Sequence, residues 1–311
     1  MIIHHNIDCF KASKTAITIG TFDGVHLGHL KVIGQLNSIA RAIGGESVLF
    51  SFYPHPRITL SDGKIDLRLI TTLDEKAQRL EQAGIDHLVV YPFTREFASL
   101  TYVRFIEQIL IGRLGLRTLI VGHDHKLGKN REGSFENIVK LSEKLNFDVV
   151  QTETFNVGGV DISSSKIREA LQQGDVSTAN NYLGYAFSLH GVVTQGNQVG
   201  RRIGYPTANI EASDPYKLIP AEGVYAITID IKGKSYPAML NIGYRPTVER
   251  NADNRTIEAH IFNFDADIYQ EEVSLSFYKR IREERRFESL EKLKEQLTYD
   301  KENVTRILKS L

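Results

Sequence analysis

The chain has very little cysteine and no excess of charge of either sign. Cys9 is the single cysteine among 311 residues, which excludes an internal disulfide and gives no sign of an oxidising compartment. Lys and Arg together number 38, as do Asp and Glu, so neither a nucleic-acid backbone nor an anionic membrane is favoured as a partner. No apolar run approaches the roughly 20 residues that span a bilayer, and no signal-peptide pattern opens the sequence. We therefore expect a soluble, cytoplasmic protein.

Short β-branched strands alternate with amphipathic helices through the first half of the chain. The strand patterns are 17–19, 47–52, 87–91, 118–121 and 148–151. The helical patterns between them are 27–43, 72–84, 100–114 and 134–145. Such alternation predicts right-handed crossovers and a Rossmann-like α/β domain whose parallel sheet is covered on both faces. Ligands of these sheets bind at the carboxyl ends of the strands.

Strand patterns dominate the second half after two short helical stretches at 165–173 and 176–183. The expected strands are 188–193, 224–231, 236–242, 256–262 and 273–279, and a helix is expected over 289–311. The segment 232–234 between two of these strands favours a hairpin. These patterns predict a small closed or Greek-key antiparallel β-barrel with a C-terminal helix. We place the domain boundary after residue 184, giving domains 1–184 and 185–311.

The segment 16–29 combines a strand, a glycine turn and a helix start. It reads AITIGTFDGVHLGH and carries His26 and His29 three residues apart, on one helical face. A strand-to-helix junction exposes backbone N–H groups and the positive end of the helix dipole, which favours a phosphate ligand. Two alternatives are an ordinary helix start with solvated or capping histidines, and a zinc pair, which no HExxH carboxylate supports.

Three further strings carry side chains suited to phosphate or to a metal. Ser164 and Ser165 open a helix at ISSSKIR, where they can cap the helix or bind phosphate oxygens. The segment FYPHP holds His55 between prolines, which by itself is more often a rigid loop. Thr207 and Asn209 in GRRIGYPTAN lie two residues apart and share a face of an extended segment. Hydroxyl and amide oxygens suit Mg²⁺, which otherwise takes water and nucleotide phosphate.

Together these strings resemble the bacterial bifunctional riboflavin kinase/FAD synthetase family. In the first half, GTFDGVHLGH is similar to GxFDGxHxGH, ISSSKIR to ISSTxIR, and FYPHP to F-x-PHP. In the second half, GRRIGYPTAN is similar to GRxxGYPTAN, NIGYRPT to NIGxRPT, and EAH to the catalytic E-x-H segment. The resemblance covers nearly the whole chain. It implies phosphorylation of riboflavin to FMN in the barrel and adenylylation of FMN to FAD in the α/β domain, both with MgATP.

The resemblance also implies roles for individual residues. Glu258 is the expected base for the ribityl hydroxyl, where a solvent-facing strand carboxylate is the alternative, and His26 and His29 are expected at the adenylyl-transfer centre. Mg²⁺ is expected on Thr207 and Asn209. ATP contacts are expected from Gly20, Phe22, Gly28, His55, Ser164, Ser165, Arg168, Gly200, Arg201 and Gly204. Flavin contacts are expected from Asp124, Tyr205 and Arg245.

One segment departs from the family pattern. Residues 122–128 read GHDHKLG where the family has GxDFRFG, so His125 and Leu127 replace aromatic side chains. Two other functions are alternatives for the chain. One is a nucleotidyltransferase for another phosphate ester with a substrate-binding or regulatory barrel, and the other is a flavin-sensing module without turnover. A magnesium site beside a base in the second half argues against the first, and the presence of His26, His29, Thr207, Asn209 and Glu258 argues against the second.

Overall fold

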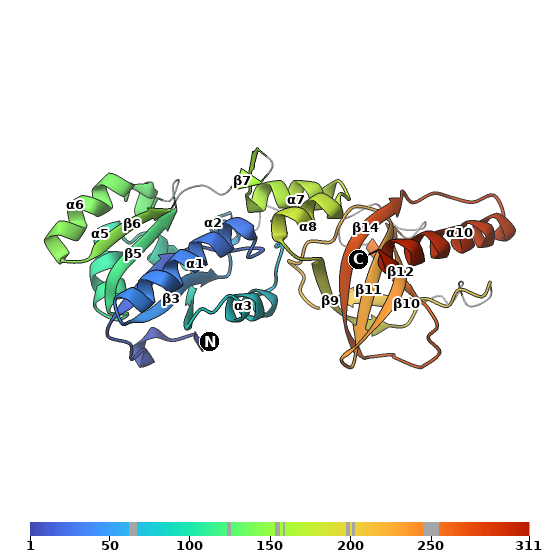
Figure 1. The fold of residues 1–311 in the computed structure, drawn as a ribbon, viewed down its shortest axis with the longest axis horizontal. Coiled ribbons are helices and arrows are strands. Elements are labelled where there is room, and N and C mark those ends of the chain that lie inside the picture. Colours follow the sequence, from blue (N-terminus) through green and yellow to red (C-terminus); the bar gives the residue numbers. More distant parts are fainter. Residues whose placement is uncertain are drawn as a thin grey trace. The chain divides into compact units, whose positions relative to one another are not determined.

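A computed structural model describes residues 1–61, 67–122, 126–152, 156–157, 159–196, 200, 203–244 and 255–310. The chain divides into two compact units (Figure 1). The α/β unit comprises Met1–Leu67 and Thr71–Ser163, and the barrel unit comprises Arg68–Ile70 and Ser164–Leu311.

The α/β unit is built on a six-stranded parallel sheet in the order β1-β4-β3-β2-β5-β6. Its strands are β1 (Ile2–His4), β2 (Thr15–Ile19), β3 (Glu46–Tyr53), β4 (His87–Pro92), β5 (Leu116–Gly122) and β6 (Asp148–Thr152). The expected parallel sheet is confirmed. The short edge strand β1 was not anticipated, because three residues are too few to show an alternating pattern.

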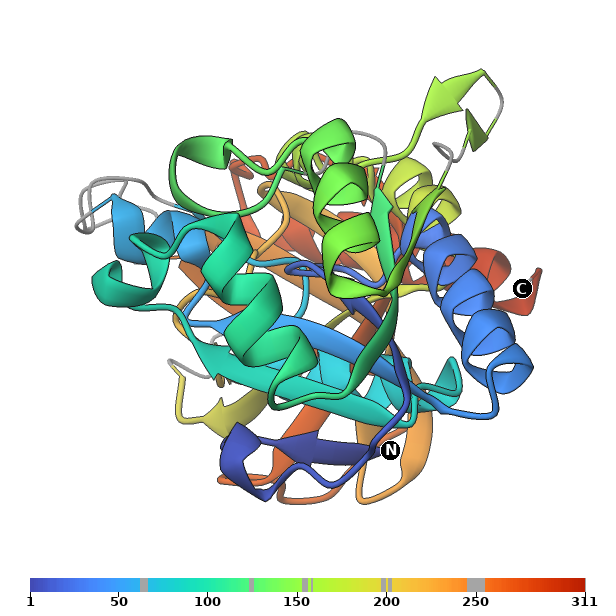
Figure 2. The same ribbon diagram turned by 90° about the vertical axis from the view of Figure 1, so that its left-hand side faces the viewer.

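Helices cover both faces of this sheet (Figure 2). They are α1 (Leu27–Ala42), α2 (Pro56–Leu60), α3 (Leu73–Gln82), α4 (Arg95–Ala98), α5 (Tyr102–Arg104) and α6 (Phe135–Leu145). Alternate strand residues face opposite ways. Ile17 therefore packs in the hydrophobic cluster that contains residues of α6, on one face of the sheet. Its neighbour Ala16 packs on the other face, in the cluster that contains residues of α1 and α3. Shorter elements are η1 (Ile7–Cys9), η3 (Lys129–Arg131), β7 (Asn156–Val157) and β8 (Val160–Asp161).

A helix was expected over 100–114, and the structure has helical turns over 102–111, most of which are π-helical. The chain forms α5 and then a π-helical segment, η2 (Phe105–Ile111). Gly112 N–H donates to the Glu107 carbonyl five residues back, at 3.0 Å. The wider π turn places Phe105, Ile106, Ile109 and Leu110 together in the core. A five-residue hydrogen-bond step leaves no distinct trace in a pattern of apolar residues, so the sequence alone indicated an ordinary helix.

The barrel unit contains a closed antiparallel barrel in the order β10-β13-β12-β11-β14-β9. Its strands are β9 (Phe187–Thr194), β10 (Ala208–Ala212), β11 (Gly223–Ile231), β12 (Lys234–Tyr244), β13 (Arg255–Ile261) and β14 (Glu272–Arg282). Lys232 and Gly233 both have positive φ, at 51° and 79°, which makes the tight β11–β12 hairpin that the sequence predicted. The expected antiparallel barrel is thus confirmed.

Three helices accompany the barrel: α7 (Ser164–Gln172), α8 (Val176–Leu183) and α10 (Leu290–Lys309). By their contacts α7 and α8 belong to the barrel unit, so the compact units divide at Ser163 and Ser164. The functional boundary after residue 184 stays a prediction.

A buried ion pair fastens α10 to the barrel. Asp300 on α10 is 1% exposed, and its Oδ2 accepts from Nε of Arg282 on β14 at 2.8 Å and lies 2.8 Å from Nη2 of the same side chain. Gln296 Nε2 donates to the other carboxylate oxygen at 2.7 Å. Val304, fully buried, packs with Met239 and Phe262 of the barrel. The Asp300 carboxylate thus holds α10 against the barrel. Side chains of α10 border one of the cavities of this unit.

We expect Asp300→Asn to lower the free energy of unfolding of the barrel unit by about 3 to 5 kcal/mol, because it leaves the Arg282 charge buried without its partner. Calorimetry of the full chain measures the change. The matched control is Lys232→Gln, which removes the exposed pair of Lys232 with Glu271 and should cost less than about 1 kcal/mol. Equal effects of the two substitutions would contradict a special role for Asp300.

Candidate active sites

The turn between β2 and α1 has a strained backbone held by a buried carboxylate. Phe22, Gly24 and Val25 have positive φ of 46°, 89° and 36°. Asp23, 4% exposed, accepts from Thr71 N–H at 3.0 Å and from the Thr71 hydroxyl at 3.3 Å. Gly24 N–H donates to that hydroxyl at 3.0 Å. These bonds tie the turn to the segment that leads into α3 and stabilise dihedral angles that side chains rarely adopt.

The two histidines of the motif lie together at the start of α1. His26 is the N-cap, and its Nδ1 accepts from His29 N–H at 3.3 Å. Since Nδ1 accepts, the hydrogen of the neutral His26 ring is on Nε2, where it can be donated to a ligand. The imidazole rings stack with centroids 3.6 Å apart. This arrangement combines a helix N-terminus with ring donors, as the phosphate interpretation requires.

Phe22 and Gly20 shape the other side of the histidine pair, which is His26 and His29. The Phe22 ring lies 4.6 Å from the His29 ring, centroid to centroid. A Cβ on Gly20 would lie 3.0 Å from that phenyl ring, so a larger residue at Gly20 would press on Phe22. Gly28, in the first turn of α1, is half-buried.

Burial keeps both histidines neutral. It lowers the pKa of His26 to about 4, although the Asp23 carboxylate acts in the opposite direction. Burial also lowers the pKa of His29 well below its ordinary value, and the neighbouring His26 and Lys76 lower it further. The Nδ1 atom of His29 is buried and has no hydrogen-bond partner among the described residues. The pair therefore presents uncharged imidazoles at neutral pH.

Lys76 is a residue of this site that the motifs did not reveal. It lies in the first turns of α3, is 7% exposed, and donates from Nζ to the Ser51 hydroxyl at 3.0 Å and to the Thr21 carbonyl at 3.3 Å. Burial lowers its pKa to about 8, while Asp23 acts to raise it. A signal was present, because Lys76 falls on the apolar stripe of its helix with Ala77 and Leu80.

His55 follows the neighbouring strand β3 at the same end of the sheet as the β2–α1 turn. It is the N-cap of α2, and its Nδ1 accepts from Arg57 N–H at 3.2 Å. Parallel pairing of β2 with β3 brings both segments to one edge of the sheet. Asp124, expected on the loop after β5, lies outside the described residues.

The serine-rich helix start belongs to the barrel unit. Ser164 and Ser165 open α7, and Arg168 on the same helix donates from Nε to the Arg68 carbonyl at 2.9 Å. That Ser164, Ser165 and Arg168 bind the same nucleotide as the histidine pair stays a prediction.

The barrel brings the second set of expected residues together. The Thr207 hydroxyl donates to Glu258 Oε2 at 3.3 Å. In the strand register, Asn209 on β10 lies opposite Glu258 on β13, and Asn241 on β12 lies opposite it on the other side. Glu258 is half-buried rather than fully solvated. A carboxylate, a hydroxyl and amide groups thus lie side by side on and next to three adjacent strands.

Tyr205 and the glycines before it build the adjoining loop. Tyr205 N–H donates to the Gly200 carbonyl at 2.8 Å, and a Cβ on Gly200 would lie 2.2 Å from the Tyr205 carbonyl oxygen. Gly204 has a φ of 84°, which favours glycine. The Tyr205 hydroxyl lies 2.8 Å from that of Thr298 on α10. Arg201 and Arg245 lie outside the described residues.

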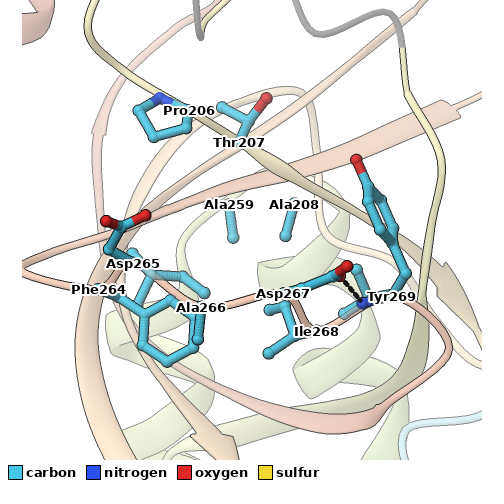
Figure 3. Close-up of a pocket in the computed structure, with 12 residues that line it drawn as sticks. Pro206, Thr207, Ala208, Ala259, Phe264, Asp265, Ala266, Asp267, Ile268 and Tyr269 are labelled. Carbon is cyan, nitrogen blue, oxygen red and sulfur yellow. Dashed lines mark hydrogen bonds between the residues drawn. The ribbon is translucent and has the colours of Figure 1, made fainter.

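Two cavities meet at Thr207. The helix-side cavity, about 320 Å³, is bordered by α10 and lined among others by Tyr205, Thr207, Met239, Leu240, Asn241, Glu258, Glu284, Phe287, Leu293 and Leu297. The loop-side cavity, about 360 Å³, lies between Pro206–Ala208 and the segment 264–269, with Ala259 at its floor (Figure 3). Tyr269 N–H donates to Asp267 in that segment at 3.0 Å. Thr207 is therefore in reach of molecules held in either cavity.

Known proteins resemble this chain over its full length. Residues 10–166 match a family model described as FAD synthetase, and residues 183–308 match one described as riboflavin kinase. The Bacillus subtilis (strain 168) protein named bifunctional riboflavin kinase/FMN adenylyltransferase is 38% identical over 309 residues, which cover 99% of this chain and 96% of the relative. The protein of that name from Escherichia coli (strain K12) is 36% identical over 297 residues, covering 95% and 93%.

A solved structure also matches nearly end to end. It is described as a macrolide-efflux protein from Streptococcus pneumoniae, is 30% identical, covers 98% of each chain and has a TM-score of 0.88. Over the described part of the present chain, we find no helix with the length and apolar character needed to cross a bilayer.

We expect the His26 ring to stay neutral down to pH 5, because burial lowers its pKa to about 4. NMR titration of the ring Cε1–H in the full chain, assigned with His26→Gln, measures this. The control is the urea-unfolded chain, in which histidine titrates near pH 6.5. Since the unfolded chain binds the proton first, this group lowers the stability of the α/β unit as the pH falls from about 6.5 toward 4. A folded-state midpoint near 6.5 would contradict the buried, neutral pair.

Proposed function

This chain belongs to the bifunctional riboflavin kinase/FMN adenylyltransferase family, and we propose from its geometry which residues carry each reaction. The protein transfers phosphate from ATP to riboflavin, giving FMN, and joins FMN to the AMP part of a second ATP, giving FAD and pyrophosphate. The observation that carries the kinase assignment is the position of Glu258. It lines the helix-side cavity and is hydrogen-bonded to Thr207, which lines both cavities.

We assign riboflavin to the helix-side cavity. Its walls include Met239, Leu240, Phe287 and Leu297, which suit a flat apolar ring system, while Glu258 and Asn241 suit the hydroxyl groups of a ribityl chain. Tyr205 borders the same cavity and is kept as a flavin contact. Flavin contacts by Arg245 and Asp124 rest on the family resemblance alone.

We assign ATP to the loop-side cavity. Small side chains at Ala208 and Ala259 leave room there, and Thr207 lies between this cavity and the flavin (Figure 3). Gly200 and Gly204 keep the neighbouring loop tight, and we retain them with Arg201 as phosphate contacts. A γ-phosphate held near Thr207 would then face a ribityl hydroxyl held near Glu258.

Glu258 acts in this proposal as the general base. Its carboxylate takes the proton of the terminal ribityl hydroxyl as that oxygen attacks the γ-phosphorus. The bond between the γ-phosphorus and the bridging oxygen breaks, and ADP leaves with the electron pair. The Thr207 hydroxyl holds one carboxylate oxygen at 3.3 Å and so helps to orient the base.

The donor set fits a magnesium ion bound with the nucleotide. Thr207 and Asn209 offer hydroxyl and amide oxygens next to the Glu258 carboxylate, and Mg²⁺ prefers such oxygen ligands. Within the described ranges, no three His, Cys, Asp or Glu side chains are grouped to hold a metal, so phosphate and water would supply the remaining ligands. When bound, the ion neutralises phosphate charge.

In the α/β unit, we propose that the histidine pair binds the reacting phosphates. The neutral rings donate hydrogen bonds to the α-phosphate while an FMN phosphate oxygen attacks its phosphorus and pyrophosphate leaves. The N-terminus of α1 adds its backbone dipole at Gly28. We propose that Ser164, Ser165 and Arg168 contact the β- and γ-phosphates of ATP, and that Gly20, Phe22 and His55 lie around the bound nucleotide.

We also propose that the protein is cytoplasmic and has no nucleic-acid partner.

A single assay tests the function. The full chain is incubated with riboflavin, ATP and Mg²⁺, and the flavins are separated by chromatography over time. FMN followed by FAD supports both activities, whereas FMN alone would refute the adenylyltransferase and unchanged riboflavin would refute the kinase.

We expect Glu258→Gln to lower the rate of FMN formation by at least about 100-fold, because the amide cannot accept the hydroxyl proton. In the same assay, supplied FMN should still be converted to FAD at the wild-type rate. Retention of kinase activity would show that Glu258 is a structural carboxylate.

His29→Ala should give the reverse result. We expect FAD formation from FMN to fall about 100-fold or more with the loss of a donor to the transition state, while riboflavin is still phosphorylated. The intact kinase reaction is the internal control for folding. FAD synthesis at the wild-type rate would exclude a phosphate role for His29.

A further inference from the structure

Lys76 is a buried cation next to the β2–α1 turn, and it has no role in the adenylyl transfer proposed for the histidine pair. Its side chain is 7% exposed. Its ammonium group joins Thr21, directly before the strained turn, to Ser51 near the end of β3. The Ser51 hydroxyl closes the triangle by donating to the Thr21 carbonyl at 3.4 Å. One side chain of α3 thus links the ends of two adjacent strands.

Packing alone does not explain a charge at this position. Burying an ammonium group costs free energy that a methionine of similar length avoids. The cost is visible in the pKa of Lys76, which burial lowers to about 8 and which the Asp23 carboxylate partly restores. Near neutral pH, the group still carries its proton most of the time. The charge is therefore present while the enzyme works.

This charge acts on His29. The titratable groups that bear on the His29 ring are His26 on α1 and Lys76 on α3, and both lower its pKa in addition to burial. Asp23 in the turn favours the charged form of His26. A proton on either ring would place positive charge within a stack whose centroids are only 3.6 Å apart. The Lys76 charge opposes protonation of the His29 ring.

We propose that Lys76 is a positioning residue for FMN adenylylation, which holds the β2–α1 turn in place and keeps His29 an uncharged hydrogen-bond donor until the phosphates of the nucleotide bind. The inference rests on the proposed role of the histidine pair. No covalent step passes through Lys76. Its contribution is to the geometry and protonation state of His29, which contacts the reacting phosphates.

The test compares Lys76→Met, Lys76→Gln and Lys76→Arg in the full chain. Methionine removes the charge and the donors, glutamine keeps donors without charge, and arginine keeps the charge. The exposed Lys144→Met on α6 is the matched control. For each protein, kcat/KM of FMN adenylylation is measured from pH 5 to 9, riboflavin phosphorylation is followed on the same samples, and the His29 ring is titrated by NMR.

We expect Lys76→Met and Lys76→Gln to lower kcat/KM of FMN adenylylation at pH 7 at least about tenfold, because a small displacement of the His29 ring from the reacting phosphates strongly lowers the rate. The acid limb of their pH profiles should move to higher pH, together with the His29 midpoint. Lys76→Arg should keep both close to wild type, and no variant should change the kinase rate. If the methionine variant does not fold, the glutamine variant carries the comparison.

An unmoved His29 midpoint in the folded neutral variants overturns the proposal, as does an unmoved acid limb with a rate within twofold of wild type. The proposal is also overturned if Lys76→Arg lowers the rate of adenylylation as much as Lys76→Met does, because the effect would then not depend on the positive charge. Failure of the proposed adenylyltransferase function would give a different result. The wild-type protein would then form no FAD, while the NMR titration would still show whether Lys76 lowers the pKa of His29.

Discussion

Burial of charge below the β2–α1 turn is the constraint on which the α/β site depends. Asp23 must be buried to hold Thr71 and the positive φ angles of the turn, and a buried carboxylate calls for compensating partners. Lys76 is nearby and brings the opposite charge. Burial keeps His26 and His29 neutral, and the Lys76 charge lowers the pKa of His29 further, so the two rings can stack face to face. The proposed phosphate site therefore depends on buried charges that lie outside the histidine pair.

In the proposed function, the barrel holds two substrates on either side of one residue. Thr207, directly before β10, lies at the boundary of both cavities, and its hydroxyl donates to Glu258 on the neighbouring strand β13. The pair of Arg282 with Asp300 then fixes α10, whose leucines complete the helix-side cavity. In the barrel unit, a buried ion pair away from the proposed reacting atoms thus supports a site made of hydrogen-bonding groups.

Periodicity predicted most of the fold, because it reports which face of an element is buried. Strands β2 to β6, the helix that begins after His26 and the hairpin at Lys232 are local features of this kind. The three residues of β1 and the short α2 left no such pattern, and the pattern over 100–114 indicated a helix without showing its π-helical turns. Among site residues, Lys76 escaped notice because one lysine on an apolar stripe usually extends to solvent.

By itself the sequence indicated the two activities through the resemblance of its motifs to one family, and those motifs predicted where the functional groups lie. GTFDGVHLGH predicts a phosphate-binding helix start, and PTAN predicts two oxygen ligands on one face. Only the tertiary structure decided that the Thr207 hydroxyl reaches Glu258, 51 residues away, and that Lys76 reaches Thr21, 55 residues away. Those contacts depend on strand register and helix placement, which arise from packing between distant segments. The opening motif thus reveals its histidines locally, whereas the cation that helps to lower the pKa of His29 comes near it only through the fold.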